Sequence, residues 1–254
     1  MEKCNTCVDS AADIYYQVVG NVHKDVSEAL LIMIQVLIQI GDGKSAIPSL
    51  IKKLSIDAQL YGFDSSQTLQ GHLVLSAAYQ DIGNLLAASE HLQSAVFIMK
   101  LCCGEHHPEM SNIFMRLAGM YQETGHHELS MKCLTVAREL VNRNGDQGTF
   151  ASICQMMAAI FADQENFKDA IALQKQSYVI FRQMYGEGEP HTADSKSRLE
   201  VLLRASTEKQ KKQLADKAER ENADKAKSSS MWLDDNFGAK ASSSKKNKKK
   251  KGKK

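Results

Sequence analysis

Apolar residues recur along most of the chain at helical spacing, in pairs of segments that glycines separate. In the stretch 104–145, a turn is followed by an apolar-periodic segment, by Gly125, and by a second such segment that ends at Gly145. This spacing predicts two amphipathic helices joined by a tight turn. A helix pair of this kind cannot bury its apolar face alone, so stacked copies are expected.

Two series of glycines repeat at a nearly constant step. The first series has steps of 42 residues (62 − 20, 104 − 62) and 41 residues (145 − 104, 186 − 145), and comprises Gly20, Gly62, Gly104, Gly145 and Gly186. The second series stands between the two helices of a pair, at steps of 42 residues (83 − 41, 125 − 83), and comprises Gly41, Gly83 and Gly125. Two series in one register predict four helix pairs between residues 20 and 189.

The same residue classes return at the same depth of each pair. The first helix carries a large apolar residue, a small residue and an aromatic one: Leu75, Ser76 and Tyr79; Leu117, Ala118 and Tyr121; Met157, Ala158 and Phe161. The second helix has a small residue, a residue four further on that is mostly leucine, and another small residue: Ala88, Leu92 and Ala95; Ser130, Leu134 and Ala137; Ala170, Gln174 and Ser177. Small residues let helices approach closely, and the aromatic one fills the space between pairs. The pattern predicts an all-α solenoid of tetratricopeptide-type helix pairs, with a period longer than the usual 34 residues or so.

The segments outside the repeats have different compositions. Residues 1–19 are predicted to form an orphan helix of a truncated repeat, and residues 190–222 a capping helix whose apolar stripe fades after Leu203. Residues 223–254 are rich in serine and lysine and are predicted to be a disordered basic tail. A cytoplasmic location is expected, because the longest apolar run, 29–40, is too short to span a membrane and no signal peptide is present.

Cysteine and histidine patterns do not favour an enzyme or a metal site. Cys4 and Cys7 lie about a hundred residues from the adjacent Cys102 and Cys103, whereas a structural zinc motif needs two closely spaced ligand pairs. The clustered histidines His106, His107, His126 and His127 stand in repeat turns or at a helix start, where solvated or capping roles are typical. No nucleotide-binding or catalytic motif is present. We expect a non-enzymatic protein with no cofactor and no bound metal.

The first helices of such repeats line the inner face of the solenoid, where polar residues recur. A carboxylate stands two residues after each aromatic: Asp81, Glu123 and Asp163. Beside them, or on earlier turns of the same faces, are Gln70, Leu73, Gln80, Asn112, Met115, Gln122 and Gln155. This set predicts a groove for a basic or mixed peptide of a protein partner. The alternative is that these polar residues are simply solvated.

The charge of the chain is divided unevenly. From Ala205 onward there are 16 Lys and Arg against 7 Asp and Glu, and the end of the chain contains Lys245, Lys246, Lys248, Lys249, Lys250, Lys251, Lys253 and Lys254. A lysine run can bind RNA or ribosomes by counterion release, and because it lacks interleaved aromatic residues, this binding is predicted to be non-specific and salt-dependent. Docking on anionic lipid, a nuclear address or a purely solubilising role are the alternatives.

Trp232 is the single tryptophan of the chain, and it lies in the serine-rich segment before Asp234 and Asp235. An exposed tryptophan in a linker would be unusual, because burial of its ring is favourable. The motif is therefore a hypothetical docking peptide, which could close over the carboxylates of the groove.

The chain resembles two families with repeats of this length. Kinesin light chains share the turn that precedes the first helix, here Gly104-Glu105-His106-His107-Pro108. The C-terminal repeat region of the clustered mitochondria protein matches over about residues 10–210, including segments 21–26, 104–110, 128–130 and 185–187. Kinesin light chains place asparagines on the groove face where this chain has Leu73, Val74, Met115 and Arg116, which favours the second family.

The resemblance to the clustered mitochondria family implies a cytoplasmic interaction scaffold needed for mitochondrial distribution. It also implies binding of mRNAs for mitochondrial proteins and, as in fungi, association with the third eukaryotic translation initiation factor complex. A cargo adaptor of the kinesin light chain type is the alternative, followed by a solely RNA-binding protein.

Overall fold

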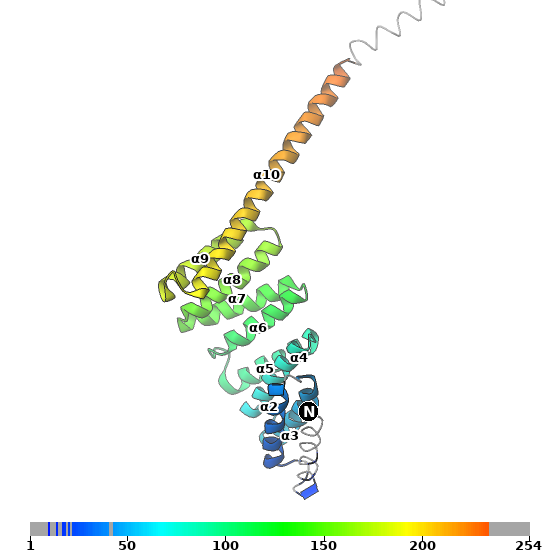
Figure 1. The fold of residues 1–254 in the computed structure, drawn as a ribbon, viewed down its shortest axis with the longest axis vertical. Helices are drawn as coiled ribbons and strands as arrows, with labels where there is room; N and C mark the ends of the chain where they lie inside the picture. The colour runs from blue at the N-terminus through cyan, green and yellow to red at the C-terminus, as the bar shows by residue number, and fades with distance from the viewer. Residues whose placement is uncertain are drawn as a thin grey trace, which may run out of the picture. The chain divides into compact units, whose positions relative to one another are not determined.

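In a computed structural model, the chain is described over residues 22–40 and 43–233 and at the isolated positions 10, 14, 17, 18 and 20, with side chains except at 38, 40, 226 and 228–233. The described residues form helices and no strand, which confirms the predicted all-α class. The helices, shown in Figure 1, are α2 (Lys24–Ile40), α3 (Gly43–Tyr61), α4 (Ser66–Asp81), α5 (Leu85–Cys103), α6 (Met110–Glu123), α7 (His127–Asn144), α8 (Gln147–Asp163), α9 (Phe167–Tyr185) and α10 (Pro190–Leu233).

Consecutive helices pack against each other and form four pairs: α2 with α3, α4 with α5, α6 with α7, and α8 with α9. We call α2, α4, α6 and α8 the first helices, and α3, α5, α7 and α9 the second helices. Each second helix also contacts the next first helix, and α6 touches α8 directly. Tyr79 packs against two adjacent core clusters, because it lies between the first and second pairs. The apolar faces of the pairs thus join into a stack of helix pairs, as the period of 42 residues predicted.

The turn between the two helices of a pair has one geometry in three repeats. Gly83 and Gly125 have φ values of 77° and 78°, in the left-handed region that favours glycine. Glu165 takes the same place in the fourth pair with φ 57°, and is the one non-glycine residue with positive φ in the described part of the chain. In each turn, the amide of the next residue donates to the carbonyl of the aromatic residue; the donors are Asn84, His126 and Asn166. This hydrogen bond keeps the turn formed where glycine is missing.

The small residues predicted on the second helices lie in the core. Ala88, Ala95, Ser130, Ala137, Ala170 and Ser177 are all fully buried. Ser130 reaches its partner helix, since its hydroxyl donates to the carbonyl of Ala118 at 2.7 Å. A larger side chain at these positions would separate the two helices of the pair.

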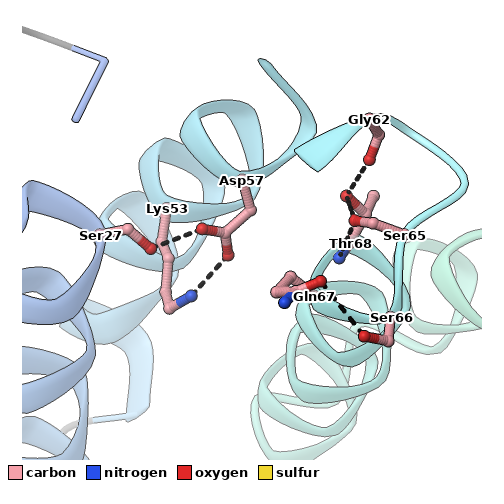
Figure 2. Close-up of polar contacts among 8 residues, drawn as sticks. All are labelled: Ser27, Lys53, Asp57, Gly62, Ser65, Ser66, Gln67 and Thr68. Atoms are coloured by element: carbon pink, nitrogen blue, oxygen red, sulfur yellow. Dashed lines mark hydrogen bonds and ion pairs between the residues drawn. The ribbon is translucent and has the colours of Figure 1, made fainter. Parts of the chain in front are cut away.

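The first pair departs from this pattern at a half-buried and a buried position of α3. Lys53 stands where α5 has Ala95, and Asp57 stands where α5 has Met99, 42 residues later in each case (95 − 53, 99 − 57). The carboxylate of Asp57 is 1% exposed and accepts from Lys53 Nζ at 2.5 Å and from the hydroxyl of Ser27 at 2.5 Å. Figure 2 shows this ion pair of α3 and the hydroxyl that reaches it from α2. The two polar substitutions satisfy each other, so the helix pair still closes.

The last pair also carries a polar substitution, which holds the start of α10. Gln174 takes the place of Leu92 and Leu134 and is 1% exposed. Its side-chain amide donates to the carbonyl and to the hydroxyl of Ser195, both at 3.0 Å. These hydrogen bonds attach the beginning of α10 to α9.

The chain divides into two compact units, Met1–Ser197 and Arg198–Lys254. The helix that begins at Pro190 continues to Leu233 instead of ending near residue 222, so residues 223–233 and Trp232 are helical and do not form a linker. Two features explain this difference. Residues 223–233 contain neither proline nor glycine, and charges alternate at four-residue spacing over Glu208, Lys212, Asp216, Arg220 and Asp224, which stabilises an exposed helix. The predicted orphan helix 1–19 and the tail beyond 233 lie outside the described ranges.

Candidate functional site

The ten groove candidates are distributed over three first helices. Gln70, Leu73, Gln80 and Asp81 lie on α4; Asn112, Met115, Gln122 and Glu123 lie on α6; Gln155 and Asp163 lie on α8. Six of them are exposed, and Leu73, Met115, Gln122 and Gln155 are half-buried. The first helices thus present a polar face with amide and carboxylate groups.

One contact joins two of these candidates across neighbouring repeats. The side-chain amide of Gln122 donates to the carboxylate of Asp163 at 3.5 Å, from the end of α6 to the end of α8. In the described part of the chain, no lysine or arginine pairs with Asp81, Glu123 or Asp163. These charges are exposed and unneutralised, which suits the binding of a basic group.

Leu73 and Met115 belong to the packing of the repeats more than to a free groove. Leu73 packs against the core cluster between the second and third pairs, and Met115 packs against the next cluster. Both side chains therefore hold first helices in place. A ligand on this face would contact the exposed polar residues around them.

Arg116 is a residue of this region that sequence reasoning did not assign to the site. Its guanidinium donates to the hydroxyl of Ser76 at 2.8 Å and so ties α6 to α4. Burial lowers the pKa of Arg116 from its ordinary value. The sequence does mark Arg116 as unusual, because a charged residue stands directly before the buried pair Leu117 and Ala118. Its partner, Ser76, becomes evident only when the first helices are stacked.

Among the described residues, three hollows lie away from the ten candidates, none of which lines them. One of about 660 Å³ lies between α3, α4 and α5, and apolar side chains form most of its wall. A second, of about 560 Å³, lies at α7 and the end of α8 and includes Phe161. The third, of about 180 Å³, lies near the pair His106 and Arg143.

The histidines form contacts within and between turns. The ring of His107 accepts from the amide of Glu109 at 3.3 Å, as a capping residue does, and His106 contacts Arg143 at 2.9 Å. Another pair was not anticipated: the Nδ1 atoms of His72 on α4 and His91 on α5 are 3.0 Å apart. Burial lowers the pKa of both rings, and for His72 the neighbouring His91 lowers the pKa further. One neutral ring can thus donate to the other.

Neither a metal site nor a membrane span is found among the described residues. Among the residues that the structure describes, no group of three or more His, Cys, Asp or Glu is arranged to hold a metal ion. Within the same residues, no helix combines the length and apolarity that crossing a membrane requires.

Known proteins similar to this chain share its repeats. No family model matches. The chain is 24% identical over 201 residues to the clustered mitochondria protein homolog of Danio rerio, and this match covers 77% of the chain. It is 23% identical over 212 residues to the homolog of Caenorhabditis elegans, covering 82% of the chain, and 23% identical over 201 residues to that of Homo sapiens, covering 77%. The chain is similar to clustered mitochondria proteins. The resemblance read from the sequence is therefore confirmed, although the chain spans only 14%, 17% and 15% of the length of these three relatives.

Solved structures with the same fold are repeat proteins. The TPR-like repeats of a kinesin light chain from P. anserina superpose with a TM-score of 0.62 at 19% identity, covering 75% of this chain and 92% of that one. BtubC (BKLC) from P. vanneervenii superposes with a TM-score of 0.63 at 17% identity, covering 87% and 89%. At these identities the likeness establishes the solenoid fold alone.

Proposed function

We propose that the repeats are a non-enzymatic interaction scaffold of the clustered mitochondria type. The observation that carries this proposal is the similarity to clustered mitochondria protein homologs, which extends over about four fifths of the chain. Stacked helix pairs provide an extended face for a protein partner. In this proposal, the scaffold contributes binding and positioning, and any chemistry belongs to its partners.

The partner on the first helices is a basic or mixed peptide in this proposal. The exposed carboxylates of Asp81, Glu123 and Asp163 stand at one position in three successive repeats without a paired cation. A peptide with positive charges would neutralise them, and the neighbouring glutamines would provide hydrogen bonds to its backbone. Regular spacing of the carboxylates favours an extended ligand that follows the stack.

A cargo adaptor of the kinesin light chain type is the second candidate, and its support is weaker. The likeness to kinesin light chain repeats concerns the fold. Where kinesin light chains place asparagines on the groove face, Leu73 packs against the core and Arg116 is engaged by Ser76. Those two side chains therefore cannot offer the same hydrogen bonds to a cargo peptide.

The finer parts of the proposal concern mRNA, translation and mitochondrial distribution in the cytoplasm. Their support is the clustered mitochondria resemblance together with the eight lysines between Lys245 and Lys254. Such a run binds phosphates by releasing counterions and does not distinguish base sequences. In this view, the repeats select a protein partner of the translation machinery, and the lysines increase residence on the mRNA.

A pull-down from cytosol with and without nuclease tests this proposal. The bait variant Asp81→Asn/Glu123→Gln/Asp163→Asn is expected to lose protein partners that nuclease leaves bound to the wild-type chain. A matched control, Glu90→Gln/Glu139→Gln/Asp169→Asn, removes three exposed carboxylates from second helices. This control should still bind the protein partners that resist nuclease.

Three results would count against parts of the proposal. Equal recovery of partners by both variants would remove the first-helix face from the function. Loss of every partner upon nuclease treatment would favour a solely RNA-binding protein, and nuclease-resistant motor subunits would favour the adaptor.

A further inference from the structure

Large apolar side chains are exposed on α3, on α5 and in the turn between α3 and α4, where the first and second helix pairs meet. Phe63 is 65% exposed, Phe97 59% and Leu101 55%, and Ile51 and Leu86 are exposed to similar degrees. Leu86, Phe97 and Leu101 lie on one stripe of α5, because their separations of 11 and 4 residues (97 − 86, 101 − 97) return to the same helix face. We call these five residues the outer patch.

The next repeat along the chain has polar residues at the corresponding positions. Counting 42 residues forward, α7 has Glu128, Glu139 and Arg143 where α5 has Leu86, Phe97 and Leu101. Likewise, Phe63 corresponds to Glu105, and Ile51 corresponds to Gln93. The repeat fold itself thus accommodates charged or polar side chains at these places. The apolar residues of the second pair are not needed for packing, which points to a contact outside the pair.

The outer patch borders the apolar groove between α3, α4 and α5. Ile51, Phe63 and Phe97 line this groove of about 660 Å³, with Leu54 and Ile98 among the other lining residues. Its floor is held by Thr68, whose hydroxyl donates to the carbonyl of Gly62 at 2.8 Å, while Ser65 caps α4 (Figure 2). The groove is thus a defined depression that can receive a side chain.

The charge of the groove fits a second copy of the same chain. None of its eleven lining residues is Asp, Glu, Lys or Arg, and burial lowers the pKa of the lining His72, which keeps this ring neutral at pH 7. Two such grooves bring no like charges together, and a charged partner would find no complementary group in them. Outside the groove, Glu90 is exposed on the same face of α5 as Leu86 and Phe97, so the two copies must meet in a register that keeps their Glu90 carboxylates apart.

The area also fits. With about 150–250 Å² for each aromatic side chain and somewhat less for each aliphatic one, the exposed fractions of the outer patch amount to roughly 500 Å² of apolar surface. A stable interface buries about 800 Å² per partner, and about 65% of a homodimer interface is apolar, or roughly 520 Å². The patch therefore supplies the apolar area that one side of a homodimer needs.

We propose that two copies of the chain associate through the outer patch, with α5 facing α5 across a twofold axis. In such a dimer, Phe97 of each copy enters the groove of the other. The dimer contact uses the outer patch, whereas the carboxylates proposed to bind a peptide lie on the first helices. A chain that does not dimerise could therefore still bind the peptide, and a chain that does not bind the peptide could still dimerise.

Sedimentation velocity of the full chain, from about 1 to 200 µM, tests the dimer. We expect the wild-type chain to dimerise with rising concentration. Phe97→Glu should raise the dimer dissociation constant at least about tenfold, because the substitution removes an aromatic anchor and occurs twice in a symmetric dimer. Leu101→Arg should act in the same direction.

Both substitutions install the residues that α7 already has at these positions, so the fold should be retained, as a circular dichroism melt can check. Val179→Glu is the matched control, since Val179 is the exposed residue of α9 (43%) at the position of Phe97, and it should leave dimerisation unchanged. A wild-type chain that stays monomeric at the highest concentration overturns the proposal. A dimer that persists equally in Phe97→Glu and Leu101→Arg also overturns it, because the copies would then meet through another surface.

Discussion

The ion pair between Lys53 and Asp57 on α3 allows us to predict how much a substitution would destabilise the first helix pair. Replacing Lys53 by alanine leaves the carboxylate of Asp57, which is 1% exposed, with a hydrogen bond from the hydroxyl of Ser27 but no cation beside it. A buried charge without a counter-charge costs several kcal/mol, since neither water nor a cation can solvate it. Lys53→Ala should therefore destabilise the contact between α2 and α3.

The magnitude follows from the burial of the two groups. Breaking a fully buried ion pair from one side costs about 3–5 kcal/mol. The side chain of Lys53 is 19% exposed, so after its removal water can reach the carboxylate in part. We expect the free energy of unfolding of the first pair to fall by about 2–4 kcal/mol at pH 7.

A second substitution should restore most of this loss. Lys53→Ala/Asp57→Met installs Ala95 and Met99 of the next repeat, which are both buried. Replacing a buried ion pair by apolar residues that pack well is often neutral. The double variant should lie within about 1 kcal/mol of the wild-type chain, so the two substitutions should be strongly non-additive.

The assay needs to resolve the first pair, because repeat arrays can unfold in parts. Hydrogen exchange of the amides in α2 and α3 reports their local opening free energy, and urea unfolding followed by circular dichroism reports the whole array. Lys44→Ala, at an exposed position of α3, is the control and should change stability by at most about 0.5 kcal/mol. If Lys53→Ala resembles this control, or if the double variant is as unstable as the single one, the reasoning from burial is wrong.

Three further predictions concern other parts of the chain. Gln174→Leu should increase hydrogen exchange at the start of α10, because Ser195 loses a donor to its carbonyl, at a cost of about 1–2 kcal/mol; unchanged exchange would contradict this. The free energy of unfolding should decrease as the pH falls below about 6.5, because the lowered pKa values of His72 and His91 mean that the unfolded chain binds more protons there; His72→Gln should flatten this dependence in a pH series of urea titrations. Deleting Lys245–Lys254 removes eight positive charges and should weaken binding to all RNA sequences about equally, with a smaller salt slope; equal affinity at two salt concentrations would exclude the lysines from RNA binding.

The repeat architecture could be predicted from the sequence because it depends on local rules. A tight turn after a helix needs a residue with positive φ, so glycine steps of 42 residues marked the turns at Gly83 and Gly125. Small side chains are needed where two helices pack closely, so the spacing of Ala88 and Ala95 predicts the buried face of α5 from the sequence alone.

Tertiary packing determines which polar side chains are buried and which residues form the surface patches. Lys53 and Asp57 are four residues apart, a spacing that on most helices indicates a solvated surface pair, and only the position of α2 buries them. The outer patch consists of residues far apart in sequence that form one surface when α3 and α5 lie side by side. Arg116 likewise meets Ser76 across two repeats. Local backbone rules place turns and helices along the chain, but burial and charge pairing depend on residues that only stacking brings together.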